Sequence, residues 1–188
     1  KIDVGLQGLK KDGIYTMPKQ NSAEDYERKC PSLKNFFKNV SGEVLFIVCG
    51  AGKISGSILR ILETIKNCQI NVVYILPDTQ LLSELSQMRN KISYNILQQY
   101  ARSGLLKRMY IIGNPSIESI IGNVPIVGYY DKLNEVIAYT MHMINVFKNT
   151  PPVMNTFSDP VDFARISTIG ALDEQQEKEN LFFPLDNI

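Results

Sequence analysis

A run of small residues between two apolar segments is the part of this chain with the clearest chemical potential. It follows residues 44–49, which are apolar enough for a buried strand, and precedes residues 58–65, which have a helical pattern. Glycines let a ligand approach the backbone closely, and amides at a helix N-terminus attract anions. We therefore predict phosphate binding by this run, although a plain turn between strand and helix is the alternative. The candidate phosphate-binding residues are Gly50, Ala51, Gly52, Lys53, Ser55, Gly56 and Ser57.

The same run differs from the P-loop of nucleotide-hydrolysing enzymes. In a P-loop the lysine follows the last glycine and precedes a serine or threonine, whereas Lys53 stands in the middle of the run. Lys53 is therefore either a solvated loop charge or a point charge that meets a β- or γ-phosphate.

Strand and helix patterns alternate around the loop. The strands are expected near 43–49, 70–76 and 108–112. The helices are expected over 22–39, 56–67, 79–103, 116–121 and 130–148, with a further short helix over 162–169. This alternation predicts an α/β fold with a mostly parallel sheet flanked by helices, against which the long helix at 130–148 lies.

The ends of the three expected strands carry glycine or polar residues. The first strand leads into residues 50–57, the second into Pro77 and Asp78, and the third into Asn114. Ligands of open parallel sheets gather at the carboxyl ends of the strands. We therefore expect these three segments to border one ligand site.

Composition bounds the class of protein. The chain has 188 residues, 44% of them hydrophobic, and a net charge of +1, so we expect one ordinary core and no charge-driven binding to nucleic acid or to a membrane. No apolar run approaches the roughly 20 residues that span a bilayer. The three cysteines form no CxxC pair, and we expect a cytoplasmic protein in which Cys49 is a small buried core thiol. His142 is the single histidine, so we expect no metal site made by protein side chains.

Five short motifs, in order over residues 40–170, resemble the tubulin and bacterial FtsZ family of GTP-dependent filament proteins. The family's phosphate loop reads GGGTGTG, and residues 50–56 match three of its glycines and the serine or threonine position. Pro77 and Asn114 stand where family strands end. Residues 130–134 read Tyr-Asp-Lys-Leu-Asn, which resembles the Tyr-Gly-Asp-Leu-Asn that begins the central helix of tubulins. Residues 160–165 read Pro-Val-Asp-Phe-Ala-Arg, where FtsZ proteins have Asn-x-Asp-Phe-Ala-Asp.

The resemblance implies a nucleotide site and a mode of assembly. Tyr130 would stack on guanine, Asn134 would hydrogen-bond the edge of the base, and Asn114 would contact the nucleotide. The implied cofactor is GTP or GDP, with Mg²⁺ as an optional companion. The implied partner is a second copy of the chain in a head-to-tail homopolymer. From the residues alone, Tyr130 is equally well an ordinary core or surface aromatic.

The acidic loop after the central helix would complete the active site of the neighbouring subunit. Asp162 is the one acid in register with the family motif and Asp159 lies close by, so these two are the candidate catalytic residues. Pro160 and Arg165 replace the other polar positions. Arg165 is either a surface residue or an arginine-finger-like group that reaches the neighbour's phosphate.

Two function classes follow, and a third is more distant. The first is a filament-forming cytoskeletal GTPase, and the second is a non-hydrolysing scaffold or binding protein that keeps the fold. The third is an unrelated α/β enzyme, because fold alone does not set function.

The expected domain division places a partial nucleotide-binding domain with the central helix over 1–150. Residues 151–188 are expected to be a loop and the start of a second domain or a linker. We expect a short strand over 1–6 and a loop over 8–20. The resemblance implies an internal piece of a longer protein, because the family's first phosphate loop, GxGGxG, has no counterpart in this chain.

Overall fold

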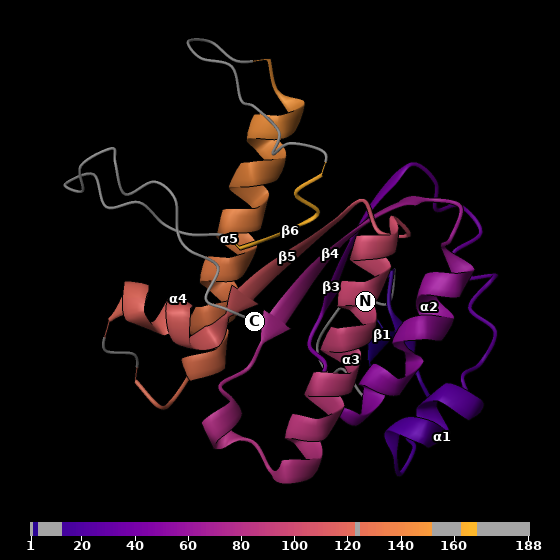
Figure 1. The fold of residues 1–188 in the computed structure, drawn as a ribbon, viewed down its shortest axis with the longest axis horizontal. Helices are drawn as coiled ribbons and strands as arrows, with labels where there is room; N and C mark the ends of the chain where they lie inside the picture. Colours follow the sequence, from indigo (N-terminus) through magenta and orange to yellow (C-terminus); the bar gives the residue numbers. More distant parts are fainter. Residues whose placement is uncertain (1, 4–12, 123–124, 152–162, 169–188) are drawn as a thin grey trace.

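The computed structural model describes residues 2–3, 13–122, 125–151 and 163–168, and Figure 1 shows how its elements are arranged. The strands are β1 (Ile2–Asp3), β2 (Tyr15–Thr16), β3 (Glu43–Val48), β4 (Gln69–Leu76), β5 (Arg108–Gly113) and β6 (Ile166–Thr168). The helices are α1 (Ala23–Arg28), α2 (Ile58–Thr64), α3 (Glu84–Ser103), α4 (Asn114–Ile121) and α5 (Tyr129–Asn149). Two short 3₁₀ helices, η1 (Lys53–Ser57) and η2 (Thr79–Leu81), precede α2 and α3.

Within the described ranges, the main sheet has four parallel strands in the order β3-β4-β5-β6. Its first three strands coincide with the three expected from the apolar runs, within one residue at each end. The predicted α/β fold with a mostly parallel sheet flanked by helices is therefore confirmed.

Helices cover both faces of this sheet, as parallel sheets require. On one face, α2 and α3 pack on alternate residues of β4 and β5 around Val72, Tyr74 and Met109. On the other face, α4 and α5 pack on the intervening residues around Val73 and Ile112. Figure 1 shows these two groups of helices on opposite sides of the strands.

β3 is not the buried strand that its apolar sequence predicts. Along it exposed and half-buried residues alternate, with Leu45 43% and Ile47 52% exposed. The reason is position, because β3 is the outermost strand among the described residues and α5 packs over β4 and β5 instead. Cys49, expected in the core, is likewise exposed.

Local signals set most helix ends. Ser83 caps α3 by accepting a hydrogen bond from the Ser86 amide, and Gly104 ends it in the left-handed conformation at φ +85°. The helix expected over 22–39 is shorter, since α1 ends at Arg28 and turns follow. Pro31 explains this end, because a proline disfavours helical backbone at the preceding residue.

The long helix expected at 130–148 is confirmed as α5. The short helix expected over 162–169 is wrong, because residues 166–168 form β6 and pair with Met109–Ile111 of β5. The Met109 amide also donates to the Arg165 carbonyl at 2.7 Å. A strand edge thus overrides a weak local helical pattern. β6 joins the main sheet although it lies beyond the expected boundary at residue 150.

The N-terminal part has its own small cluster. β1 pairs in parallel with β2, which lies inside the segment expected to be a loop. Met17, Tyr26 and Leu33 pack with Ile61 of α2, which anchors α1 beside the loop that follows β3.

Candidate functional site

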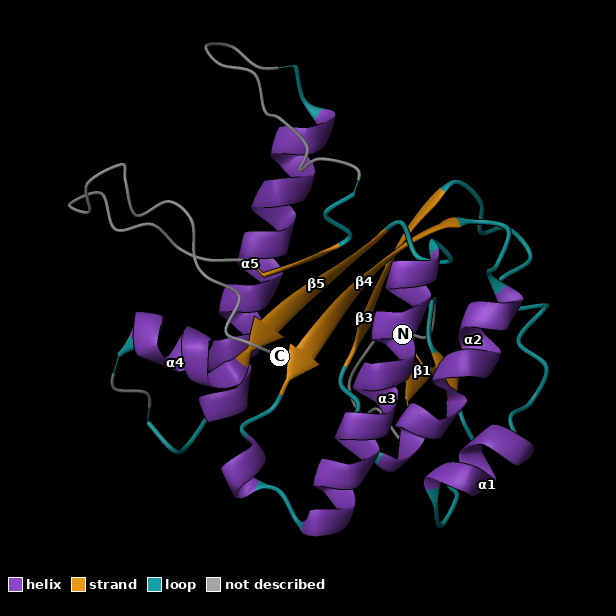
Figure 2. Ribbon diagram, in the orientation of Figure 1, coloured by secondary structure: helices purple, strands orange, loops and turns teal. Residues whose placement is uncertain are grey.

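The carboxyl ends of β3, β4 and β5 meet at one edge of the sheet. Val48 pairs with Tyr74, and Leu76 pairs with Gly113, so the strands run in register towards that edge. Figure 2 shows the arrowheads of β4 and β5 pointing the same way. The residues 50–57 that follow β3, here called the glycine loop, therefore share an edge with Asp78 and Asn114, as the sequence predicts.

The glycines of this loop are used for close packing rather than for unusual backbone angles, since none of them has a positive φ. A side-chain carbon at Gly50 would overlap the Tyr74 hydroxyl, and one at Gly56 would overlap the Ala23 carbonyl. Gly52 differs, because a side-chain carbon there would lie 3.9 Å from Cγ2 of Ile54, which is an ordinary van der Waals distance. Only Gly52 is thus placed for close approach of a ligand.

Three consecutive amides of the loop make no hydrogen bond to any described residue. They belong to Gly52, Lys53 and Ile54 and come at the start of η1, where the first amides have no partner within the helix. The Ser55 amide, by contrast, donates to the Gly52 carbonyl at 3.1 Å. Successive unpaired backbone amides at a turn are groups that can donate to an anion.

The side chains of the loop divide into outward and inward groups. Lys53 is exposed and forms no ion pair within the described residues. Ser55 and Ser57 are buried, at 7% and 1% exposure, and the Ser57 hydroxyl donates to the Ile54 carbonyl at 2.7 Å. Lys53 can reach a ligand on the outer side, whereas Ser57 stabilises the turn from within.

Two residues behind the loop were missed by sequence reasoning. Arg89 of α3 donates from Nε to the Ala51 carbonyl at 3.0 Å. The Tyr74 hydroxyl donates to Asn90 Oδ1 at 2.7 Å, and burial raises the pKa of Tyr74 far above its ordinary value. The helical pattern of residues 79–103 gave no sign that Arg89 reaches across 38 positions to this loop.

Asn114 is the first residue of α4 and lies directly after β5. It is only 8% exposed, and its side-chain amide makes no hydrogen bond to a described residue. A nearly buried amide with this free capacity is suited to a polar ligand at the sheet edge.

The start of α5 adjoins the ends of β4 and β5. The Tyr129 hydroxyl donates to Glu118 of α4 at 3.0 Å. The pKa of Tyr129 is raised by burial, by that hydrogen bond and, through space, by the charge of Asp78 at the end of β4. Tyr130 packs edge-to-face on Tyr129, with ring centroids 5.1 Å apart. These contacts bring α5 to the predicted edge.

Tyr130 and Asn134 lie on the same side of α5, because residues four apart in a helix are neighbours on its surface. Both are exposed, Tyr130 by 62%, while Leu133 between them is buried against the sheet. An exposed ring one turn from an exposed amide is an arrangement that can stack on a base and hydrogen-bond its edge.

The predicted site residues therefore border one edge but do not touch each other across it. Among the described residues, no hydrogen bond joins the glycine loop to Asn114, Tyr130 or Asn134. β3 and β5 are two strand spacings apart, about 10 Å. A ligand with an anionic end and an aromatic end can bridge that gap.

A cavity of about 150 Å³ lies on another side of the glycine loop, between α1 and α3. Ser55, Gly56 and Arg89 line it together with Glu24 and Glu27 of α1. Asn114, Tyr130 and Asn134 do not line this cavity, so it includes only the glycine-loop part of the predicted site.

The candidate catalytic acids Asp159 and Asp162 lie outside the described residues. Arg165 is described, and its guanidinium occupies the space where a side chain at Gly104 would stand. A cation there complements the C-terminal end of the α3 dipole. Arg165 therefore has a structural role within its own chain.

Within the described ranges, no group of three or more His, Cys, Asp or Glu side chains could hold a metal ion. In the same part of the chain, each helix is too short or too polar to cross a lipid bilayer.

Comparison with known proteins returned neither a matching family model nor a matching curated protein.

Proposed function

We propose that this protein binds a guanine nucleotide at the carboxyl-end edge of its sheet and assembles head to tail as a cytoplasmic, tubulin- or FtsZ-like filament protein. The observation that carries the proposal is the row of three open amides at Gly52, Lys53 and Ile54, on the edge that the start of α5 also borders. The motif resemblance supplies the identity of the ligand, and the geometry supports it.

The phosphate end of the ligand belongs at the glycine loop. The open amides donate to phosphate oxygens, and Lys53 adds a mobile positive charge on the exposed side. Any Mg²⁺ would be held mainly by the phosphates and water, as is usual for this ion.

The base end belongs at α5. The exposed ring of Tyr130 would cover the guanine, and Asn134 would hydrogen-bond its edge from one turn further along the helix. The nearly buried amide of Asn114 lies at the end of β5, next to this helix start.

Assembly follows from where the acidic loop lies in the sequence. Asp162 and Asp159 come after α5, whose C-terminal end is far from the glycine loop, so they would serve the nucleotide of the next subunit. A contact between two different surfaces that does not close into a ring makes an open filament. Asp162 would position the attacking water, and Asp159 is its nearby alternative.

A non-hydrolysing scaffold is the second candidate, and one observation favours it. Arg165 stands where the family has its second acid, and its guanidinium packs against Gly104 of the same chain. With a single acid in register, we expect turnover to be slow even where binding is intact.

Identification of the nucleotide that co-purifies with the protein tests the proposal, followed by light scattering after GTP is added. We expect GDP or GTP in the denatured supernatant and a rise in scattering that depends on GTP. An absence of bound guanine nucleotide, together with unchanged scattering, would contradict it. Assembly with GTP but no phosphate release would select the scaffold over the GTPase.

A further inference from the structure

Arg89 forms a long-range polar clamp between α3 and the glycine loop. Its Nε donates to the Ala51 carbonyl at 3.0 Å, and its Nη2 donates to the Ser86 hydroxyl at 2.8 Å. Ser86 lies one turn earlier on α3 and is itself bonded to the capping Ser83. The guanidinium is thus fixed on the helix while it holds the loop.

The clamp also sets the direction of the next amide. In a trans peptide the C=O and the following N–H point to opposite sides. Because Arg89 draws the Ala51 carbonyl towards α3, the Gly52 N–H points away from α3. Gly52 is exposed, and a side-chain carbon there would make no overlap. This is the first of the three open amides.

Two other amides near the strand end have side-chain acceptors close by. The Gly50 amide faces the Tyr74 oxygen and the Ala51 amide faces the sulfur of Cys49, and each lowers the pKa of the group that it faces. The Gly52 amide, in the peptide that Arg89 holds, is the first in the loop without a hydrogen-bond partner among the described residues.

We propose that Arg89 is the positioning residue of the glycine loop. By holding the Ala51 carbonyl, Arg89 directs the Gly52 amide towards the phosphate. This inference rests on the proposed function. Arg89 acts through the loop and does not itself contact the ligand.

The geometry calls for arginine rather than for any cation. Nε and Nη2 of one planar group reach two acceptors at once, which a lysine ammonium on a flexible stem does less well. A salt bridge is not the reason for the residue, because Arg89 forms no ion pair with Glu24 or Glu27 across the neighbouring cavity within the described residues.

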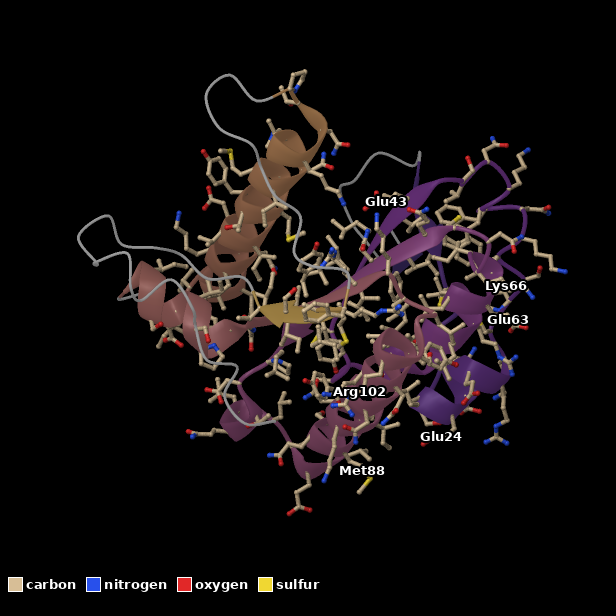
Figure 3. All side chains as sticks on the ribbon, turned by 45° about the horizontal axis from the view of Figure 1, so that its top comes forward. Glu24, Glu43, Glu63, Lys66, Met88 and Arg102 are labelled. Atoms are coloured by element: carbon tan, nitrogen blue, oxygen red, sulfur yellow. The ribbon has the colours of Figure 1, made fainter. Side chains whose placement is uncertain are left out.

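The experiment compares Arg89→Ala, Arg89→Lys and the matched control Arg102→Ala in the whole protein. Arg102 lies at the other end of α3 and is exposed (Figure 3). The first measurement is hydrogen exchange of the peptide covering residues 50–57 without nucleotide. We expect exchange at Ser55, Gly56 and Ser57 to accelerate about tenfold in Arg89→Ala and less in Arg89→Lys, because a charge-assisted hydrogen bond is lost. Unchanged exchange in Arg89→Ala, or equal acceleration in Arg102→Ala, would overturn the inference.

The second measurement compares the affinities for GDP and for guanosine, which lacks the phosphates. Arg89→Ala should weaken GDP binding about tenfold and leave guanosine binding unchanged. Arg89→Lys should have a GDP affinity between those of Arg89→Ala and the parent. Equal loss for both ligands, or no loss for GDP, would contradict a positioning role. If the parent protein bound neither ligand, the proposed function would fail. Faster hydrogen exchange in Arg89→Ala would then show a purely structural clamp, which would contradict the inference.

Discussion

Gly56 lies directly against the backbone carbonyl of Ala23, so a side-chain carbon at this position would overlap the Ala23 oxygen. Ala23 is the first residue of α1, and the glycine loop is therefore also the packing surface for that helix. One glycine of the loop thus has a structural duty that its place in a phosphate-loop motif does not reveal.

Gly56→Ala should consequently destabilise the protein, whereas Gly52→Ala should not. We expect Gly56→Ala to lower the free energy of unfolding by about 1–3 kcal/mol, the usual range for overpacking. At Gly52 the backbone has φ −76° and ψ 155°, which alanine adopts readily, and the added carbon would lie at van der Waals distance from Ile54. Urea denaturation of both variants measures the difference, and equal destabilisation would refute the packing role.

Tyr130→Ala should weaken guanine-nucleotide binding about tenfold. Base stacking on an aromatic side chain is worth roughly 1–3 kcal/mol in single-stranded nucleic-acid sites. Tyr139→Ala is the matched control, since Tyr139 is a second exposed tyrosine of α5, 67% accessible. Calorimetric affinities that are the same for Tyr130→Ala and the parent would reject the stacking role.

Glu43 should contribute stability that depends on pH. It accepts a hydrogen bond from Lys148 at 3.0 Å, which is the largest cause that holds its pKa below the ordinary value of 4.5, and Lys107 lies 3.8 Å away. A carboxyl with a depressed folded-state pKa stabilises the fold above its unfolded pKa and loses this contribution as the pH falls through the folded pKa.

Glu43→Gln should therefore be less stable than the parent at neutral pH, by about 1 kcal/mol or less because the pair is partly exposed. The difference should shrink as the pH falls below 4.5. Glu63→Gln is the control, because the ion pair of Glu63 with Arg60 is exposed on both sides. Figure 3 labels Glu63 and Glu43. Thermal melts at a series of pH values measure both variants. A deficit for Glu43→Gln that stays constant down to low pH would show that the charge is not responsible.

Asp162→Ala should slow GTP hydrolysis by about 10²–10⁴-fold, the usual cost of losing a general base, while GTP binding and assembly persist. Asp159→Ala is the neighbouring comparison and should cost less, because Asp159 is out of register with the family motif. The rate of phosphate release from assembled protein tests both variants. A parental rate for Asp162→Ala would exclude a catalytic role for this residue.

The sequence predicted the strands and long helices well, because apolar runs and helical periods are local properties. β6 could not be found this way, since residues 166–168 become a strand only by pairing with β5, far away in the chain. The exposure of Leu45 and Ile47 could likewise not be predicted, because it depends on which strands α5 covers.

The candidate site was predictable in outline and not in detail. The shared edge followed from the parallel order of the strands, and the structure brings Asn114 and the start of α5 to it. The sequence could not separate the packing duty of Gly50 and Gly56 from the open position of Gly52. It also could not show that Arg89 reaches the loop, because a helical pattern does not say which distant carbonyl a basic side chain meets.

The central claim is that this edge of the sheet binds guanine nucleotides. Calorimetric titration of the nucleotide-free protein with GDP and, separately, with ADP tests it most directly. We predict saturable one-to-one binding of GDP and at least tenfold weaker binding of ADP, because Asn134 would pair with the guanine edge. No measurable binding of GDP, or equal affinity for GDP and ADP, would contradict the claim.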